Sequence, residues 1–308
     1  MNKKRNLTIE EQIARMKKRY LAVLAVLGLV IILLGCFIYL NYDYIAFKHF
    51  ITSFYFDTEA LDELYKSRLG RDVDGRYYKY FDDLAISLIT KGIREIKNDR
   101  YTYLYTPESY RKYLNEEKEE AEQSEIKVLT DKTAMLKLTN FSKYTGKFVK
   151  DNQALLKKYP NLIIDLRDNY GGDIDVMAFI SDLFLPKGSI IATDKLRMLN
   201  WVYKAKRPKM MDFEKIYILQ NKNSASASEN FISALKDNLS NVNLIGENTY
   251  GKGIGQYTLQ IKRGFAVKAT ILSWYTPKGI NIHNKGIEPD IRYDKEDIVQ
   301  YALDMIEG

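Results

Sequence analysis

The sequence predicts an α/β protein that carries a helical segment and one membrane-spanning helix at its N-terminal end. Three observations lead to this fold class: strand-like and helix-like segments alternate after residue 126, apolar residues recur at helical spacing between about residues 47 and 114, and residues 21–40 form an uncharged apolar run. The 308 residues are 46% hydrophobic and 28% charged, which excludes low-complexity disorder and a disulfide-stapled miniprotein. The length predicts roughly two domains.

The apolar run predicts a membrane anchor. It reads LAVLAVLGLVIILLGCFIYL, and the uncharged stretch continues to Tyr42 before Asp43 ends it. At about 1.5 Å per residue, this helix is long enough to cross the hydrocarbon core of a bilayer. Residues 1–20 carry seven Lys and Arg against two Glu, so the positive-inside rule places this tail in the cytoplasm. We therefore expect a membrane helix at residues 21–42 and all later residues outside the cytoplasm. The Lys-, Asn-, Ile- and Tyr-rich composition favours a bacterial cell membrane.

An alternative interpretation of the same run is a lipoprotein signal. The residues Leu33-Leu34-Gly35-Cys36 loosely resemble a lipoprotein processing site, at which a lipidated Cys36 would replace the helix as anchor. Four more apolar residues follow the cysteine, however, where a polar tether is expected. This favours the uncleaved helix, and a cleaved secretory signal is disfavoured because no small-residue cleavage site follows the run. Both leading interpretations attach the protein to a membrane.

The residues outside the membrane divide into a helical part and an α/β part. We expect a helical domain and linker at 43–125, because apolar residues such as Tyr78, Phe81 and Leu84 recur at helical spacing. The charge run Glu116–Glu122 predicts a solvated helix end or linker at the boundary. Most of the net charge of +7 belongs to the N-terminal tail, so we expect no nucleic-acid partner.

The predicted α/β core covers residues 126–294, and a C-terminal helix follows at 295–308. Alternation of strands with helices favours parallel β-α-β units. The expected strands are 126–129, 134–138, 161–166, 215–220, 242–245, 256–261 and 265–275, and the expected helices are 174–185 and 226–237.

One segment with chemical potential is Asn223–Glu229, which reads NSASASE between a predicted strand and a predicted helix. Its small residues allow a sharp turn. A serine hydroxyl there lies at a helix N-terminus, where free N–H groups and the helix dipole favour an oxyanion. Taken alone, the segment is better explained by an ordinary capping box, because Ser226 and Glu229 have the S-x-x-E spacing.

A second segment is Gly246–Gln256, which reads GENTYGKGIGQ. It comes within one residue of a phosphate-binding loop, but Gly253 stands where the Mg²⁺-binding hydroxyl is required, and a strand-like stretch follows instead of a helix. A nucleotide site is therefore disfavoured. Lys252 could instead serve as a general base, because a desolvated lysine loses proton affinity, and Gln256 could orient its amine. The alternative is a solvated turn.

A third segment is Asp165–Gly172, which reads DLRDNYGG at the end of a predicted strand. Paired glycines let backbone N–H groups approach a ligand, as an oxyanion hole requires, although a plain turn with an acidic rim explains them as well. The nearby aspartates lack the spacing of an EF-hand loop. With one cysteine and only His49 and His283 in the chain, a zinc site or a Ser-His-Asp triad is disfavoured, and no metal or cofactor is expected.

Together and in this order, the segments resemble the C-terminal processing (tail-specific) peptidase family of Ser/Lys proteases. The resemblance runs from about Ile126 to Ile291. It rests on four motifs: NLIIDLRDNYGG, NSASASEN, GENTYGKGIGQ and the closing YTPKGINIHNKGIEPDI.

The resemblance implies a crotonase-like (ClpP/crotonase-type) protease core and a role for several residues. It implies that Ser226 is the nucleophile, Lys252 its general base and Gln256 the residue that orients the lysine. The oxyanion-hole N–H groups would come from Ala227, Gly171 and Gly172, and Asp237 would occupy an auxiliary acidic position. The chain departs from the family pattern by one extra residue between nucleophile and base, and by Tyr170 before the paired glycines.

One family feature has no room in this chain. Family members usually carry a PDZ domain between the helical part and the first core strand, but only about a dozen residues separate Leu114 from Ile126. The layout is similar to that of nisin resistance proteins, which cleave a lanthionine peptide. A histidine is the base in that branch, and neither histidine of this chain lies in a segment that matches it.

We therefore expect a membrane-anchored extracytoplasmic serine endopeptidase that cleaves peptides or unfolded protein segments. Two alternatives remain: a nisin-resistance-type peptidase that cleaves an antimicrobial peptide, and a catalytically silent peptide-binding module. The oligomeric state is not predicted.

Overall fold

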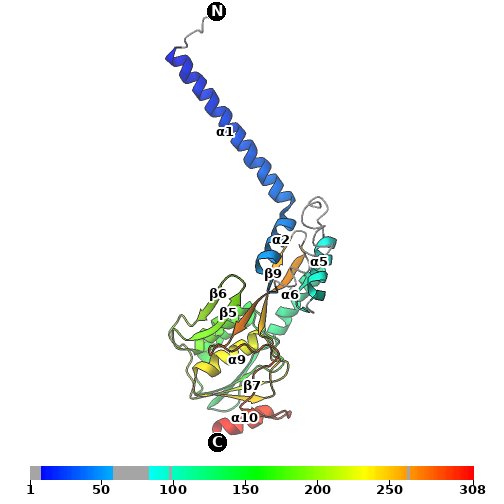
Figure 1. The fold of residues 1–308 in the computed structure, drawn as a ribbon. Helices are drawn as coiled ribbons and strands as arrows, with labels where there is room; N and C mark the ends of the chain where they lie inside the picture. The colour runs from blue at the N-terminus through cyan, green and yellow to red at the C-terminus, as the bar shows by residue number, and fades with distance from the viewer. Residues whose placement is uncertain (1–7, 58–82, 97–98, 262–263) are drawn as a thin grey trace, which may run out of the picture.

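The computed structural model describes residues 8–57, 83–96, 99–261 and 264–308. A long N-terminal helix extends away from a body of two β-sheets and their covering helices (Figure 1). The expected helical positions Tyr78 and Phe81 lie outside the described residues.

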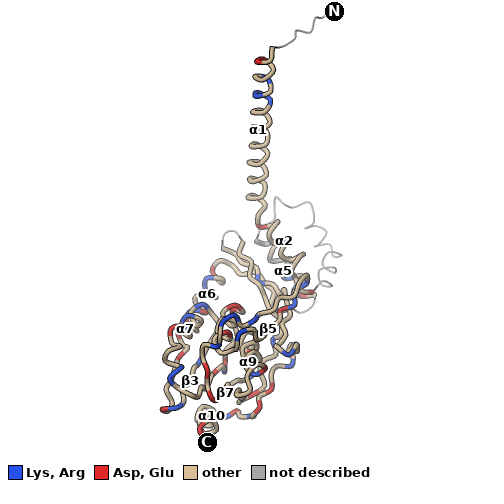
Figure 2. Tube along the Cα trace, turned by 90° about the vertical axis from the view of Figure 1, so that its left-hand side faces the viewer, with Lys and Arg blue, Asp and Glu red and all other residues tan. Residues whose placement is uncertain are grey.

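The extended helix, α1, contains the predicted membrane segment and spans Ile9–Leu40. Thr8 caps it, since its side chain accepts from the N–H of Glu11 while the Glu11 carboxylate accepts from the N–H of Thr8. The charged positions of α1, acidic in its first turn and then basic, lie near its N-terminal end, and uncharged residues form the rest (Figure 2). None of its residues is buried, and among the described residues it is the one helix long and apolar enough to cross a membrane. Cys36 lies exposed within it.

The first sheet has the parallel core that alternating strands and helices predicted. Its strand order is β11-β8-β7-β4-β3-β2, and every pair is parallel except β2 with β3. The strands are β2 (Glu125–Val128), β3 (Thr133–Lys137), β4 (Asn161–Asp165), β7 (Lys215–Gln220), β8 (Val242–Gly246) and β11 (Ile291–Arg292).

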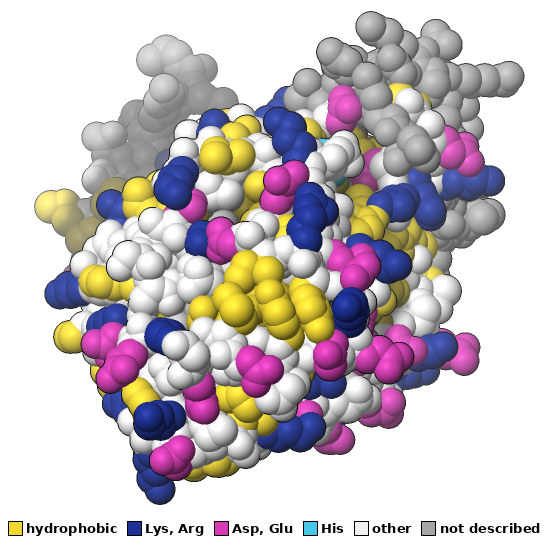
Figure 3. Space-filling view, turned by 90° about the horizontal axis from the view of Figure 1, so that it is seen from below, with side chains coloured by type: hydrophobic (Ala, Val, Ile, Leu, Met, Phe, Trp, Pro, Cys, Tyr) yellow, Lys and Arg dark blue, Asp and Glu magenta, His cyan; other side chains and the backbone are white. Residues whose placement is uncertain are grey.

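Helices cover both faces of this sheet. Its central strands are almost continuous apolar runs, so apolar side chains point to both faces and both must be shielded from water. On one face, Leu136, Ile164 and Ile218 pack against α7 (Lys143–Leu156), α8 (Ile174–Phe184) and α9 (Ala227–Asn238). On the other face, Met135 and Ile163 pack against α10 (Ile298–Glu307). The face seen from below carries interspersed acidic and basic side chains, with hydrophobic atoms gathered near its centre (Figure 3).

The second sheet is antiparallel and includes three strands that the sequence did not predict, β1, β5 and β6. Its order is β1-β10-β5-β6, and β9 pairs with β10. The strands are β1 (Tyr103–Tyr105), β5 (Ile190–Leu196), β6 (Asn200–Lys204), β9 (Ile254–Gln260) and β10 (Ala266–Tyr275). The unexpected strands β5 and β6 carry charged and exposed residues that weaken their apolar alternation.

The expected helical domain shares its hydrophobic core with the second sheet. Its described part contains α2 (Tyr42–Phe54), α5 (Asp83–Ile96), the strand β1 and α6 (Pro107–Ala121). Phe47 and Phe50 of α2 and Ile93 of α5 pack with Val267 and Ile271 of β10. The charge run expected as a helix end or linker forms the last turns of α6. The described residues of this segment therefore pack onto the second sheet.

The helix α9 is fixed by a buried aromatic contact. Phe231 is fully buried, and its ring centroid lies 5.6 Å from that of Phe141 and 5.9 Å from that of Phe184. We expect Phe231→Ala to lower the free energy of unfolding by about 3–5 kcal/mol, because it removes a large buried side chain and leaves a cavity. Chemical denaturation followed by circular dichroism measures this loss. Met305→Ala, at a position that is 41% exposed, is the control and should cost far less; equal losses would contradict the assignment of Phe231 to the core.

Candidate active site

The turn into α9 holds Ser226 in a conformation that non-glycine residues rarely adopt. Its backbone has φ 58° and ψ −118°, and it is the N-cap of the helix. The preceding loop is tied to the end of β4, since the Ser224 hydroxyl donates to the carbonyl of Leu166 at 2.8 Å and the N–H of Ala225 donates to the carbonyl of Asn169 at 3.0 Å. These bonds support the sharp turn and place Ser226 at the positive end of the helix dipole.

The buried carboxylate of Glu229 joins the two segments that the sequence singled out. Its Oε2 accepts from the N–H of Ser226 and from the N–H of Lys252, both at 2.8 Å. Its Oε1 accepts from the N–H of Gly251 and the hydroxyl of Thr249, both at 2.6 Å. Burial raises the pKa of Glu229, and these four donors oppose the rise. The capping-box glutamate therefore also fixes the position of the Lys252 backbone.

The amine of Lys252 lies in a desolvated environment. Its Nζ is 4.7 Å from the centroid of the Tyr101 ring, and its carbonyl accepts from the indole N–H of Trp274 at 2.8 Å. Burial and, to a smaller extent, the positive charge of Lys268 together lower the pKa of Lys252 to about 8, while the Glu229 carboxylate opposes the change. A lysine with this pKa is partly neutral near pH 7. The structure shows no hydrogen bond between Nζ of Lys252 and Oγ of Ser226.

The paired glycines pack directly against the Ser226 turn. A Cβ on Gly171, which has φ 102°, would lie 2.7 Å from the carbonyl oxygen of Ala225 and 2.9 Å from the nitrogen of Ala227, so only glycine fits. The N–H of Gly171 donates to Oδ1 of Asn169 at 2.9 Å, which removes it from the expected oxyanion donors in this structure. The N–H groups of Ala227 and Gly172 have no acceptor among the described residues. The sequence did not indicate that the side-chain oxygen of Asn169 would accept a hydrogen bond from the N–H of Gly171.

Two other predicted site residues have contacts that differ from the expectation. The side-chain nitrogen of Gln256 lies 3.4 Å from the Thr270 hydroxyl, and no hydrogen bond joins Gln256 to Lys252 among the described residues. Asp237 lies near the far end of α9, about 16 Å along the helix from Ser226. It forms an ion pair with Lys278 at 3.1 Å, so it holds the loop after β10 and lies away from the reacting groups.

His283 lies closer to the lysine segment than the sequence indicated. A Cβ on Gly253 would lie 2.6 Å from the backbone nitrogen of His283, and the N–H of Asn284 donates to the carbonyl of Gly251 at 2.8 Å. Nδ1 of His283 is buried without a hydrogen-bond partner among the described residues, and burial lowers the pKa of the ring. His49 lies instead in α2, with its Nδ1 3.3 Å from the Ser53 hydroxyl.

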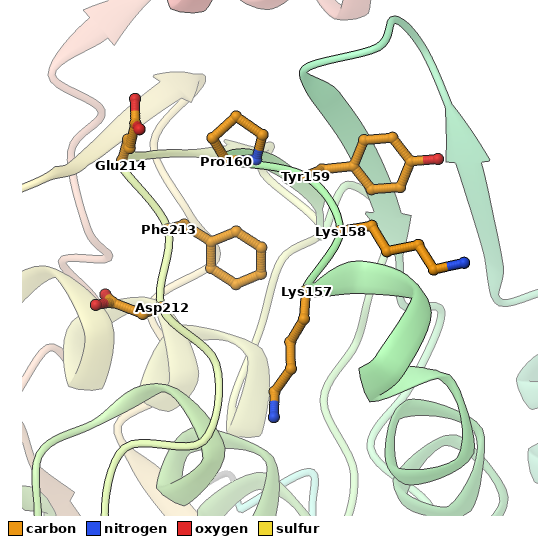
Figure 4. Close-up of a pocket in the computed structure, with 7 residues that line it drawn as sticks. All are labelled: Lys157, Lys158, Tyr159, Pro160, Asp212, Phe213 and Glu214. Atoms are coloured by element: carbon orange, nitrogen blue, oxygen red, sulfur yellow. The ribbon is translucent and has the colours of Figure 1, made fainter.

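A pocket of about 390 Å³ lies away from these residues (Figure 4). It is lined by residues 157–160 and 212–214, which precede β4 and β7. Ser226 and Gly171 follow the opposite, C-terminal ends of these two strands. Ligands of open parallel sheets bind at the C-terminal ends, so the pocket is not part of the candidate site. No group of three or more metal-ligating side chains able to hold an ion is found in the described part of the chain.

Comparison with known proteins gives relatives that match between 42% and 68% of this chain. A probable CtpA-like serine protease of Staphylococcus aureus is 32% identical over 222 residues, which are 68% of this chain and 43% of the relative. A protein with the same description from Staphylococcus epidermidis is 38% identical over 136 residues, which are 42% of this chain and 27% of the relative. The chain thus spans less than half the length of these curated relatives.

Two solved structures share the fold at low sequence identity. A lipoprotein from Streptococcus agalactiae is 15% identical with a TM-score of 0.65, and the match covers 87% of this chain and 96% of that one. A putative peptidase from Parabacteroides merdae is 17% identical with a TM-score of 0.52, covering 80% of this chain and 89% of that one. Both show similarity of fold alone.

The role of Glu229 can be tested through stability. In Glu229→Gln, one side-chain oxygen becomes an NH₂ donor that faces backbone N–H donors, so we expect a loss of about 2–3 kcal/mol in the free energy of unfolding. Thermal and denaturant unfolding measure it. Glu307→Gln is the matched control, because a single oxygen of Glu307 accepts from both Thr130 and Thr133 and glutamine keeps an oxygen there. Equal stability of the Glu229 variant and the wild type would contradict the bridging role.

The family assignment rests on the core and on the order of its motifs. The family model of peptidase family S41 matches residues 132–293, which include the paired glycines, the Ser226 turn and the Lys252 segment. The match covers more than half of the chain, and the CtpA-like relatives agree with it. The chain belongs to peptidase family S41.

Proposed function

We propose that this protein is a membrane-anchored serine endopeptidase in which Ser226 is the nucleophile and Lys252 the general base. The observation that carries the proposal is the bridge through Glu229, which bonds to the backbone N–H groups of both residues at 2.8 Å. The lowered pKa of Lys252, to about 8, supports the same assignment. Membership of family S41 and the CtpA-like serine protease relatives support peptide-bond hydrolysis.

In the proposed reaction, the neutral amine of Lys252 takes the proton from the Ser226 hydroxyl as Oγ attacks the peptide carbonyl carbon. The oxygen of that carbonyl becomes an oxyanion, which the free N–H groups of Ala227 and Gly172 stabilise at the N-terminal end of α9. The protonated lysine then gives its proton to the leaving amine. Water hydrolyses the acyl-enzyme through the same lysine and restores Ser226.

The proposed location is outside the cytoplasm, with α1 as a single-pass anchor. The seven basic residues in the first twenty support a cytoplasmic N-terminus, and the exposed apolar surface of α1 supports insertion into a bilayer. Peptides or unfolded protein segments are the proposed substrates, and an antimicrobial peptide is the alternative substrate. The crotonase-like assignment and the domain boundaries stay predictions.

The dyad predicts which substitutions abolish cleavage. The full chain in detergent should cleave a pool of peptides and unfolded proteins, with products read by mass spectrometry. Ser226→Ala and Lys252→Arg should each lower kcat/KM by at least about a thousandfold, because arginine keeps the charge but does not act as a base at neutral pH.

His283→Ala is the control for a histidine base. It should retain cleavage if Lys252 is the base, and loss of activity in this variant with full activity in Lys252→Arg would contradict the dyad. Binding of peptides by the wild type and by Ser226→Ala without cleavage by either would indicate a catalytically silent binding module.

The pH dependence follows from the lysine. The amine is active only when neutral, so kcat/KM should rise with pH, with a midpoint at about 8, and then level off. Lys268→Met removes a positive charge that lowers the pKa of Lys252, so the midpoint should move to higher pH. Lys147→Met, at an exposed position on α7, is the charge-matched control and should leave it in place. A flat profile between about pH 5 and 9 would contradict a lysine base.

A further inference from the structure

The helix that begins at Ser226 presents one face to the strand β5. Helix α9 packs against β5, and at its C-terminal end the side-chain amide of Asn238 donates to the carbonyl of Ile190 at 2.8 Å. Residues four apart share a face of a helix, so Asn230 and Ala234 lie on the same face as Asn238. Asn230 follows Ser226 by one helical turn. The side chain of Asn230 is therefore directed toward the β5 side of α9, close to the candidate active site.

Asp194 of β5 lies at the end of the α9–β5 contact that is nearer to the proposed catalytic residues. From Ile190 to Asp194 the strand advances about 13 Å, and from Asn238 back to Asn230 the helix retraces about 12 Å. Trp274 lies opposite Asp194 in the paired strand β10. The indole N–H of Trp274 donates to the carbonyl of Lys252 at 2.8 Å, which ties this end of the sheet to the proposed base. The N–H of Lys252 in turn donates to Glu229 in the first turn of α9, so Asp194 lies toward the N-terminal end of α9 and Ile190 toward its C-terminal end.

The polar groups of Asp194 and Asn230 are buried without partners. Asp194 is 2% exposed and Asn230 is fully buried. Oδ1 of Asp194 and both side-chain polar atoms of Asn230 have no hydrogen-bond partner among the described residues. Burial and, to a smaller extent, the carboxylate of Asp175 together raise the pKa of Asp194 to about 7, and no described positive charge opposes this rise. Buried polar groups in native proteins are almost always satisfied, and unsatisfied ones beside a reactive serine call for a ligand.

We propose that Asp194 and Asn230 form a specificity pocket that receives a basic side chain, Lys or Arg, of the peptide substrate next to the cleaved bond. The inference rests on the proposed peptidase function. A carboxylate and an amide oxygen are the acceptors that an ammonium or guanidinium group requires. The tryptophans opposite Asp194, Trp201 in β6 and Trp274 in β10, add aromatic surface of the kind that accompanies bound cations. The pocket adjoins Ser226 because Asn230 is one turn from it, so it selects the residue at the scissile bond.

The test compares two peptides that differ at a single position, lysine in one and norleucine in the other, cleaved by the full chain in detergent. The wild type should prefer the lysine peptide, and Asp194→Asn should lower the lysine-to-norleucine ratio of kcat/KM by about tenfold to a hundredfold. Asp151→Asn removes an exposed carboxylate on α7 and should leave the ratio unchanged. The thermal midpoint of each variant, measured without ligand, reports whether it is folded. A wild-type ratio near one that Asp194→Asn does not change would overturn the pocket while leaving the peptidase function standing.

A second measurement does not depend on catalysis. Benzamidine, a small aromatic cation, should raise the thermal midpoint of Ser226→Ala in a concentration-dependent way, because a ligand that binds only the folded state stabilises it. The shift should be absent in the double variant Ser226→Ala, Asp194→Asn. If the wild type cleaves no peptide, the proposed function fails. The comparison of benzamidine shifts between the single and the double variant then tests by itself whether Asp194 binds a cation. Equal shifts in the two proteins, or no shift in either, would overturn the inference.

Discussion

The carboxylate of Glu229 is the interaction on which the candidate active site depends. It is fully buried, and its two oxygens accept four hydrogen bonds from two chain segments that lie more than twenty residues apart. One segment contains Ser226 and the other contains Lys252. An ionised group in a buried position is stable only when several donors compensate its lost hydration. The four donors supply that compensation, so the requirements of one buried charge fix the relative positions of the proposed nucleophile and base.

Close packing of backbone around Ser226 is the second constraint. The serine has a positive φ, and Gly171 approaches the turn so closely that any side chain would collide with the backbone of Ala225 and Ala227. Strain of this kind persists only where the surroundings hold it in place. Here the bonds from the loop to β4 and the packing of Phe231 in the core hold it. The stability of the parallel sheet and the geometry of the Ser226 turn are therefore linked.

The antiparallel sheet supplies the electrostatic environment of the lysine. The segment before the core contributes Tyr101 over the amine, β10 contributes Lys268 and Trp274, and burial lowers the proton affinity of the amine. In β5 of the same sheet, the buried carboxyl of Asp194 is paired in register with Trp274 of β10, and burial raises its pKa. The helices α2 and α5 share a core with β10, so the chain that follows α1 and the chain around the lysine form one packed unit.

The sequence alone determined the parallel core, the apolar N-terminal helix and the family motifs. Each of these is a local pattern: the strands β4, β7 and β8 are short apolar runs, and the Ser226 and Lys252 segments are contiguous motifs. The capping-box pairing of Ser226 with Glu229 was likewise visible from spacing. The hydrogen bonds that Glu229 accepts from the Lys252 segment were not visible, because the two segments meet only in the folded chain.

Only the tertiary structure decided the remaining features, because they depend on contacts between residues distant in sequence. The strands β5 and β6 carry weak apolar patterns and are held by pairing with β10. Asn169 takes the N–H of Gly171, and Asp237 turns out to bind Lys278 at the far end of α9. The unpaired polar groups of Asp194 and Asn230 are likewise a product of packing. A sequence records which groups are present, but burial and partners, which set pKa values and hydrogen bonds, arise only when the elements pack together.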